Sequence, residues 1–183
     1  AEIEAALAAN NQMLPFEPPH FSANTTLGGM VAAGLSGPRR PWGGSVRDAV
    51  LGVKLLNGRG EVLRLGGQVM KNVAGYDVSR LMVGAMGTLG VLLEVSVKVL
   101  PRPACERTLV FDSTTQPPRI SEMPITASLE VDGMRYLRLS ASSRCVEMAA
   151  NQLGGRDADP AIWTAARDQT LSFFATDLPL WRI

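Results

Sequence analysis

The groups best suited to bind a ligand gather in one glycine-rich stretch, residues 24–44. Its glycines are Gly28, Gly29, Gly34, Gly37, Gly43 and Gly44. Glycine lets the backbone adopt a positive φ and approach another group closely. Thr25 and Thr26 are predicted to cap a short helix whose first residues carry little side chain, and its N–H groups would suit an anion such as a pyrophosphate. The alternative is a helix of small residues packed tightly against a sheet.

Arg39 and Arg40 lie in the same stretch, between Pro38 and Pro41. A guanidinium group binds oxyanions through two parallel hydrogen bonds, so this pair could hold a pyrophosphate or a substrate carboxylate. The alternative is a solvated pair on the surface, and the sequence favours neither interpretation.

A second polar cluster consists of Lys71, Asn72, Tyr76 and Asp77, in otherwise apolar sequence. These side chains could line the rim of a ligand pocket. In the alternative, Tyr76 packs in the core and Asp77 only caps the following helix; for Asp77 the sequence favours the cap.

The composition argues against several classes of function. Its 18 Lys and Arg against 17 Asp and Glu give a net charge of +1 without a basic stripe, so nucleic acid is not expected as a partner. Cys105 and Cys145 have no CxxC spacing and the single His20 cannot complete a ligand cluster, so no metal site is predicted. His20 could act as an acid–base group, although a structural role is preferred. Charged residues and glycines interrupt the most apolar window, residues 81–100, and no transmembrane segment is predicted.

Several elements must position the glycine-rich stretch. A helix is predicted from Glu2 to about Asn10, followed by a proline-rich extended segment. Strand-like runs at 50–56 and 61–65 flank a turn at 57–60 and predict a hairpin that supports the stretch. A helix over 78–83 and a half-buried strand over 91–100 should follow, with Pro101 and Pro103 ending the strand.

The remaining sequence predicts a separate set of elements. Strands are expected at 108–111, 126–131 and 134–140, with Asp132-Gly133 as a two-residue hairpin turn. Ser142 or Ser143 should cap a helix through Leu153, and a last helix should run from Asp159-Pro160 to about Phe174. Residues 113–124 are polar and proline-rich and predict a surface connection. We therefore expect an α+β fold of two domains, residues 1–103 and 104–183.

Longer motifs carry a family resemblance: Phe16-Glu-Pro-Pro-His20, Thr26-Leu-Gly-Gly29, Gly37-Pro-Arg-Arg-Pro-Trp-Gly-Gly44, Met70-Lys-Asn-Val-Ala-Gly-Tyr-Asp77 and the run 81–95. They resemble the second half of the FAD-binding domain of vanillyl-alcohol-oxidase-type (PCMH-type) flavoproteins. More narrowly, they are similar to the FAD-binding E subunits of bacterial glycolate oxidases. Motifs of this length are far more specific than a lone glycine pattern.

The resemblance implies that residues 1–103 form the C-terminal part of a PCMH-type FAD-binding domain. Residues 104–183 would form an α+β cap lobe over the flavin and substrate, incomplete at its C-terminus. The family's N-terminal FAD lobe, with its glycine-rich pyrophosphate loop, is expected upstream of Ala1, so the sequence is interpreted as a central fragment.

The resemblance also implies FAD as the cofactor and a set of site residues. The FAD-binding residues are expected to be Thr25, Thr26, Leu27, Gly28, Gly29, Ser36, Gly37, Trp42, Gly43, Gly44, Ser45, Gly90 and Val91. Substrate contacts are expected from Arg39, Arg40, Lys71, Asn72 and Tyr76. No catalytic base is identified, and the metal-binding His and Glu cluster of the related D subunits is not found in this sequence.

The implied function is oxidation of a 2-hydroxy acid such as glycolate, with hydride transfer to FAD and onward electron transfer to an iron–sulfur partner subunit. A sister flavin subunit is implied as well. One alternative is a non-catalytic assembly or electron-relay subunit that keeps the FAD fold; another is a flavin oxidoreductase acting on a different alcohol or hydroxy acid. A cytoplasmic location is expected, with peripheral attachment to the inner face of the membrane through the complex as an option.

Overall fold

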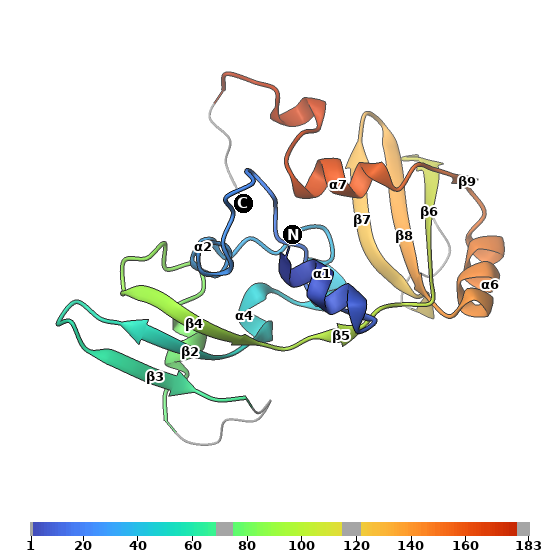
Figure 1. Cartoon of the computed structure of the whole chain (residues 1–183). Coiled ribbons are helices and arrows are strands. Elements are labelled where there is room, and N and C mark those ends of the chain that lie inside the picture. Colours follow the sequence, from blue (N-terminus) through green and yellow to red (C-terminus); the bar gives the residue numbers. More distant parts are fainter. Residues whose placement is uncertain (1, 69–74, 115–121, 179–183) are drawn as a thin grey trace. The chain divides into compact units, whose positions relative to one another are not determined.

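The structure is a computed structural model that describes residues 2–68, 75–114 and 122–178. The chain divides into two compact units, Ala1–Arg102 (unit 1) and Pro103–Ile183 (unit 2), and each has its own hydrophobic core. Both units combine helices with antiparallel sheets (Figure 1). The predicted α+β class is therefore confirmed.

Unit 1 is built around a three-stranded sheet in the order β3-β2-β4 (Figure 1). Its elements are α1 (Glu2–Ala9), β1 (Gln12–Met13), α2 (Leu27–Ala33), α3 (Arg40–Gly43), α4 (Val46–Ala49), β2 (Val50–Leu56), β3 (Val62–Gly66), α5 (Val78–Leu81), β4 (Val91–Val97) and β5 (Leu100–Pro101). The predicted hairpin is confirmed, because β2 and β3 pair from Gly52↔Gly66 to Leu56↔Val62. Buried side chains of the central strand, Val53 and Leu55, join the core that also contains Val31 of α2.

The predicted continuous strand over 91–100 is wrong. β4 ends at Val97, and the next backbone N–H, that of Lys98, donates to Ala49 O at 2.8 Å instead of to a strand. The chain then pairs again as β5, whose Pro101 lies opposite Gln12 of β1. A two-stranded edge tolerates a residue without an N–H group, so proline is accommodated there.

Short helices of unit 1 are held by side-chain caps. Asp77 Oδ1 accepts a hydrogen bond from Arg80 N at 3.1 Å, which confirms the predicted cap, although α5 ends at Leu81. At α4, Asp48 Oδ2 accepts from both the N–H and the hydroxyl of Ser45, each at 2.8 Å. These two hydrogen bonds, the backbone one first, lower the pKa of Asp48 below its ordinary value of 3.8. The folded state therefore stabilises the charged form of this carboxylate.

We predict that Asp48→Ala destabilises unit 1 by about 0.5–2 kcal/mol at neutral pH, because the helix start loses its capping carboxylate. The folded-state pKa lies below the unfolded one, so this contribution is present above the ordinary value of 3.8 and is lost as the pH falls through the folded-state value. Urea unfolding of both proteins at pH 7 and at about pH 3 measures the difference. A difference in unfolding free energy between the two proteins that stays constant with pH would contradict the role of the charged Asp48 carboxylate as a cap.

Unit 2 carries a four-stranded sheet in the order β7-β8-β6-β9. Its elements are β6 (Cys105–Asp112), β7 (Ile125–Val131), β8 (Met134–Ala141), α6 (Ser143–Leu153), β9 (Arg156–Asp157), α7 (Ala161–Arg167) and the 3₁₀ turn Ser172–Phe174. The predicted β7–β8 hairpin is confirmed, with positive φ at Asp132 (51°) and Gly133 (71°). Ser142, rather than Ser143, caps α6 through a 3.4 Å hydrogen bond from Cys145 N.

The predicted last helix to about Phe174 is too long. α7 ends at Arg167, and Gln169 adopts a positive φ of 56°, which a right-handed helix does not contain. The short strand β9 was not predicted from the sequence. It pairs with the middle of β6, and Arg107 and Asp157 reinforce this edge with hydrogen bonds of 2.6 and 3.0 Å.

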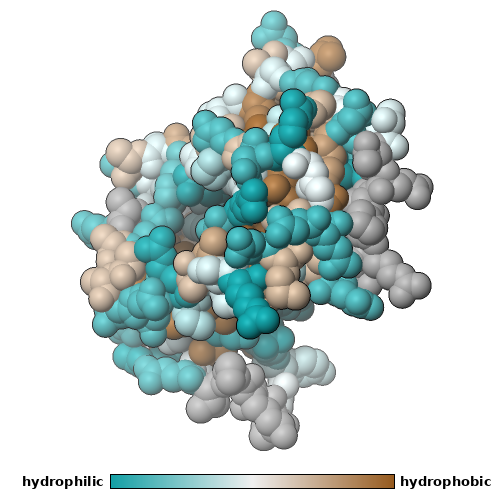
Figure 2. Space-filling view, turned by 90° about the vertical axis from the view of Figure 1, so that its right-hand side faces the viewer, coloured by the Kyte–Doolittle hydropathy of each residue, from teal (hydrophilic) through white to brown (hydrophobic). Residues whose placement is uncertain are grey.

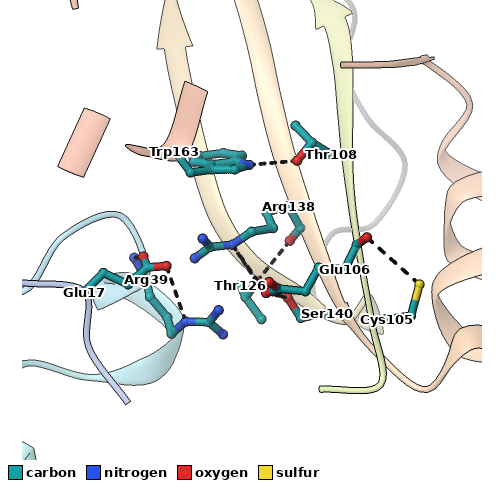
Figure 3. Close-up of polar contacts among 9 residues, drawn as sticks. All are labelled: Glu17, Arg39, Cys105, Glu106, Thr108, Thr126, Arg138, Ser140 and Trp163. Carbon is teal, nitrogen blue, oxygen red and sulfur yellow. Dashed lines mark hydrogen bonds and ion pairs between the residues drawn. The ribbon is translucent and has the colours of Figure 1, made fainter. Parts of the chain in front are cut away.

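The two faces of the unit 2 sheet are chemically different. On one face, Leu109, Leu137 and Leu139 form a core with Val146 and Ala149 of α6. Apart from Val110, the residues that alternate with them along β6 and β8 carry polar groups. Figure 3 shows a connected set from Trp163 and Thr108 through Arg138, Thr126 and Ser140 to Glu106. Alternation along β6 and β8 therefore gives an apolar face and a mostly polar one.

A hydrogen bond links α7 to the polar face. Nε1 of Trp163 donates to the hydroxyl of Thr108 at 2.8 Å, and both residues are 5% exposed. The guanidinium of Arg138 lies 5.2 Å from the centre of the same indole ring (Figure 3). The indole thus serves both as a donor and as the face of a cation–π contact.

We predict that Trp163→Phe and Thr108→Val each destabilise unit 2 by about 1–3 kcal/mol, because each leaves one buried polar group without its partner. The double variant should lose about 1 kcal/mol less than the sum of the single losses, because it removes both partners together. Urea unfolding followed by far-ultraviolet circular dichroism measures all four proteins. Additive losses would show that the hydrogen bond contributes nothing.

Candidate functional site

The start of α2 is organised by Thr26, as predicted. Thr26 Oγ1 accepts from Gly29 N at 3.1 Å, and the first hydrogen bond within the helix runs from Met30 N to Thr26 O at 3.0 Å. The N–H groups of Leu27 and Gly28 precede that bond, so they are the donors that a helix start offers to a ligand. Thr25 does not cap α2, because its hydroxyl donates to Ser22 O at 2.9 Å.

The end of α2 is bound to the turn formed by residues 84–90. Gly84 N donates to Val31 O at 3.1 Å and Met86 N to Ala32 O at 2.9 Å, so this turn satisfies two carbonyl groups at the helix terminus. The sequence offered no signal for this long-range link. It fixes the turn, and the strand β4 that follows it, beside the helix.

A groove of about 290 Å³ lies between α2 and this turn; we call it the α2 groove. Its lining consists of Thr26, Gly28, Gly29, Ala32, Met82, Gly87, Gly90, Val91 and Leu92. Five of the residues predicted to bind FAD therefore meet in one place: Thr26, Gly28, Gly29, Gly90 and Val91. About sixty residues separate Gly29 from Gly90 in the sequence, and the fold brings the two segments together.

A second cavity of about 370 Å³, the α1 cavity, shares Thr26 with the α2 groove. Its lining includes the predicted residues Thr25, Thr26 and Leu27, together with apolar side chains of α1 and of the proline-rich segment. It also contains His20, whose Nε2 lies 3.2 Å from Glu4 Oε1. Glu4 is the partner that sequence reasoning missed, because it lies on α1, sixteen positions away.

Gly28 and Gly29 lie in the wall of the α2 groove. A Cβ atom at Gly29 would approach only Thr26 Oγ1, at 3.2 Å, and one at Gly28 would lie 3.7 Å from Leu92, an ordinary contact distance. A Cβ at Gly28 would thus fit against β4, whereas one at Gly29 would require the Thr26 side chain to shift slightly, so the interpretation as helix-to-sheet packing stays open beside the interpretation as a ligand site. Both residues line the α2 groove, and the absence of a side chain leaves their backbone accessible from it.

Gly90 both packs tightly inside unit 1 and lines the α2 groove. Its φ is +145°, and a Cβ atom would lie 2.6 Å from Leu56 O and 2.6 Å from a methyl group of Leu55. The backbone of β2 thus needs glycine here whether or not a ligand is bound, although the residue also lines the groove.

Several other predicted cofactor residues have a structural role inside unit 1. A Cβ at Gly37 (φ +70°) would lie 2.2 Å from Glu17 O, and one at Gly43 would lie 2.7 Å from Pro15 O. Ser36 Oγ accepts from Val46 N at 3.1 Å, and Ser45 belongs to the cap of α4. Gly44 has a φ of +87°, and Trp42 is 41% exposed; neither lines the two cavities described above. FAD contacts from these six residues stay a prediction.

The arginine pair separates into two environments. Arg39 is only 7% exposed; its N–H donates to Glu17 Oε2 at 2.9 Å, and its Nε lies 3.8 Å from Oε1 (Figure 3). The interpretation of Arg39 as a solvated surface residue is therefore wrong, whereas Arg40 is exposed. Tyr76 is 96% exposed, so its interpretation as a core residue is wrong as well. Lys71 and Asn72 lie outside the described residues.

This chain resembles known proteins in sequence and in fold. Residues 1–66 match the model of the family described as FAD binding domain. Glycolate oxidase subunit GlcE of Escherichia coli (strain K12) is 48% identical over 188 residues, which cover 99% of this chain and 54% of GlcE. Glycolate oxidase subunit GlcD of Bacillus subtilis (strain 168) is 40% identical over 97 residues, 52% of this chain and 21% of GlcD. The chain spans about half the length of GlcE.

The fold also resembles that of alkyldihydroxyacetonephosphate synthase, with a TM-score of 0.67 over 92% of this chain and 42% of the synthase chain. At 18% identity this likeness shows the fold alone. Within the described ranges, no helix is both long and apolar enough to cross a membrane. Residues 1–66 are thus similar to the FAD binding domain family, and the chain as a whole is similar to glycolate oxidase subunit GlcE, as its motifs indicated, with FAD as the cofactor that these matches support.

Proposed function

We propose that unit 1 forms one wall of an FAD site, with the cofactor lying across the start of α2. The observation that carries this proposal is the meeting of Thr26, Gly28 and Gly29 with Gly90 and Val91 in the α2 groove. The N–H groups of Leu27 and Gly28 would donate to phosphate oxygens, since a helix start favours negative charge. Without side chains, Gly28 and Gly29 would admit the cofactor close to the backbone of the groove wall.

The reaction that we propose is oxidation of a 2-hydroxy acid such as glycolate. Bound FAD supplies the redox chemistry by accepting a hydride from C2 of the acid. The residues of this chain hold and orient the cofactor, and Arg40, Tyr76, Lys71 and Asn72 stay candidates for contacts with the substrate. The names of GlcE and GlcD support this substrate class.

Unit 2 is proposed as the cap lobe beside the FAD-binding domain. Its own core and sheet and the division at Arg102/Pro103 support a boundary next to the proposed one, residues 1–103 and 104–183. A sister flavin subunit and an iron–sulfur subunit that takes up the electrons are part of the same proposal, as is a cytoplasmic complex that attaches to the inner face of the membrane.

A second candidate function is a subunit that binds FAD and relays electrons without oxidising substrate itself. One observation favours it: Arg39, a candidate for binding the substrate carboxylate, is buried and paired with Glu17. The two functions differ in whether the substrate reaches the flavin of this subunit.

We predict that Gly29→Val in the full-length subunit weakens FAD binding at least tenfold, because the branched side chain fills the groove beside the helix start. The melting temperature of the cofactor-free protein should fall only modestly: a Cβ at this position lies 3.2 Å from Thr26 Oγ1, so that side chain must shift slightly, and no other atom outside the helix backbone lies within 4 Å of the Cβ. Gly58→Val is the matched control: a Cβ there meets nothing within 4 Å, and the residue lies in the β2–β3 turn. A large loss of stability with unchanged FAD affinity would end the assignment of this groove.

Flavin reduction separates the two candidate functions. Glycolate added without oxygen to the purified, FAD-loaded full-length subunit should bleach the flavin absorbance if this subunit accepts the hydride. Dithionite provides the fully reduced reference. Bleaching by dithionite but not by glycolate would favour the electron-relay subunit.

A further inference from the structure

The turn between β2 and β3 carries a reactive dipeptide, Asn57-Gly58 (Figure 1). It is the single place in the sequence where glycine follows asparagine. Apolar surface does not single out another site in the same way, because Figure 2 shows hydrophobic residues among hydrophilic ones, a common arrangement on protein surfaces. The chemistry of this dipeptide is therefore what distinguishes the turn.

The side-chain amide of Asn57 is surrounded by groups that suit a reaction at its carbonyl carbon, Cγ. Its Oδ1 accepts hydrogen bonds from two backbone N–H groups, that of Arg59 at 2.9 Å and that of Glu61 at 3.0 Å. Donors placed in this way stabilise the negative charge that develops on a carbonyl oxygen when a nucleophile attacks its carbon. Its Nδ2 donates to Glu61 Oε2 at 2.7 Å, so a carboxylate that can carry a proton lies beside the nitrogen that would leave.

The backbone nitrogen of Gly58 is the adjacent nucleophile. Within the described ranges its N–H has no hydrogen-bond partner, whereas the turn is closed by bonds from Asn57 N to Glu61 O and from Gly60 N to Asn57 O. A Cβ at Gly58 would meet nothing within 4 Å, and the φ of this residue lies outside the left-handed region. The turn therefore leaves this nitrogen unhindered, at a residue that is exposed to water.

We propose that Asn57 is a site of spontaneous deamidation, with the Glu61 carboxylate assisting the proton transfer. The nitrogen of Gly58 attacks Cγ of Asn57, and the bond between them forms as this nitrogen gives up its proton. The bond from Cγ to Nδ2 then breaks, and Nδ2 leaves as ammonia with the additional proton. Water opens the resulting five-membered imide at either carbonyl group and leaves aspartate or isoaspartate at position 57. Only water is consumed.

The product weakens the end of the hairpin. An aspartate at position 57 has no N–H donor for Glu61, and the two carboxylates repel each other. Isoaspartate places an additional methylene group in the main chain, which shifts the backbone bond between residues 57 and 61. The preceding residue, Leu56, pairs with both Val62 and Val91, so the modified residue directly follows the pair that contains a residue of the α2 groove. Deamidation would thus replace a closing hydrogen bond with a repulsion.

The test incubates the full-length subunit at mildly alkaline pH, which favours deprotonation of the nucleophile, and digests it for peptide mass spectrometry. Aspartate and isoaspartate should accumulate at position 57 at least about tenfold faster than at Asn24 and Asn151, which are also exposed but precede residues with side chains. Hydroxylamine, which cleaves the cyclic imide, should cut the chain between residues 57 and 58. An Asn57 amide that persists as long as those of Asn24 and Asn151 would overturn the inference.

Two variants test the steps of the reaction. Gly58→Ala should slow the conversion at least about tenfold, because the new Cβ hinders the approach of the nitrogen to Cγ. Its melting temperature should stay nearly unchanged, since the site has room for that atom. Glu61→Gln keeps an acceptor beside Nδ2 but removes the charge, and should slow the conversion about three- to tenfold.

Arg59→Gln, in the same turn, is the matched control. The contact of Arg59 with Asn57 comes from its backbone N–H, so the rate should stay within about twofold of the parent rate. Undiminished conversion in Gly58→Ala would overturn the route through the imide. An unchanged rate in Glu61→Gln would overturn the role of the carboxylate.

Discussion

The site in unit 1 depends on hydrogen bonds at the two ends of one seven-residue helix. At its start, the hydroxyl of Thr26 holds the N–H of Gly29; at its end, the turn 84–90 donates to the carbonyl groups of Val31 and Ala32. A helix this short is not stable by itself, since most helical stability in proteins comes from tertiary contacts. The same bonds that stabilise α2 also set the width of the groove, so fold and site are specified together.

The glycine-rich stretch serves two purposes that its composition does not distinguish. Near α2, Gly28 and Gly29 line the groove; further along, Gly37 and Gly43 allow the backbone of the proline-rich segment to approach closely. The pairing of Glu17 with the buried Arg39 strengthens that second contact. Glycines proposed to bind the cofactor and glycines needed for internal packing are thus close together in sequence, and only three-dimensional contacts separate the two groups.

The sequence predicted what local chemistry determines. The cap at Thr26, the cap at Asp77 and the Asp132-Gly133 turn depend on residues a few positions apart, and all three are confirmed. Long motifs led to the correct relatives. Contacts between distant residues could not be read in this way: Glu4 beside His20 and Val31 beside Gly84 join separate elements. The predicted length of the helix after Pro160 is wrong because Gln169 adopts a left-handed conformation just beyond Arg167. No glycine or proline in the sequence indicates this helix end.

The central claim is that FAD lies across the start of α2 and reaches the turn before β4. Amide resonances of the full-length subunit, followed by nuclear magnetic resonance during titration with FAD, test it most directly. The account predicts that the largest shifts fall on the N–H groups of Leu27, Gly28, Gly90 and Val91, while Gly154, in the unit 2 turn after α6, serves as a reference. Binding of FAD that leaves the amides of Leu27 and Gly28 unshifted would contradict it.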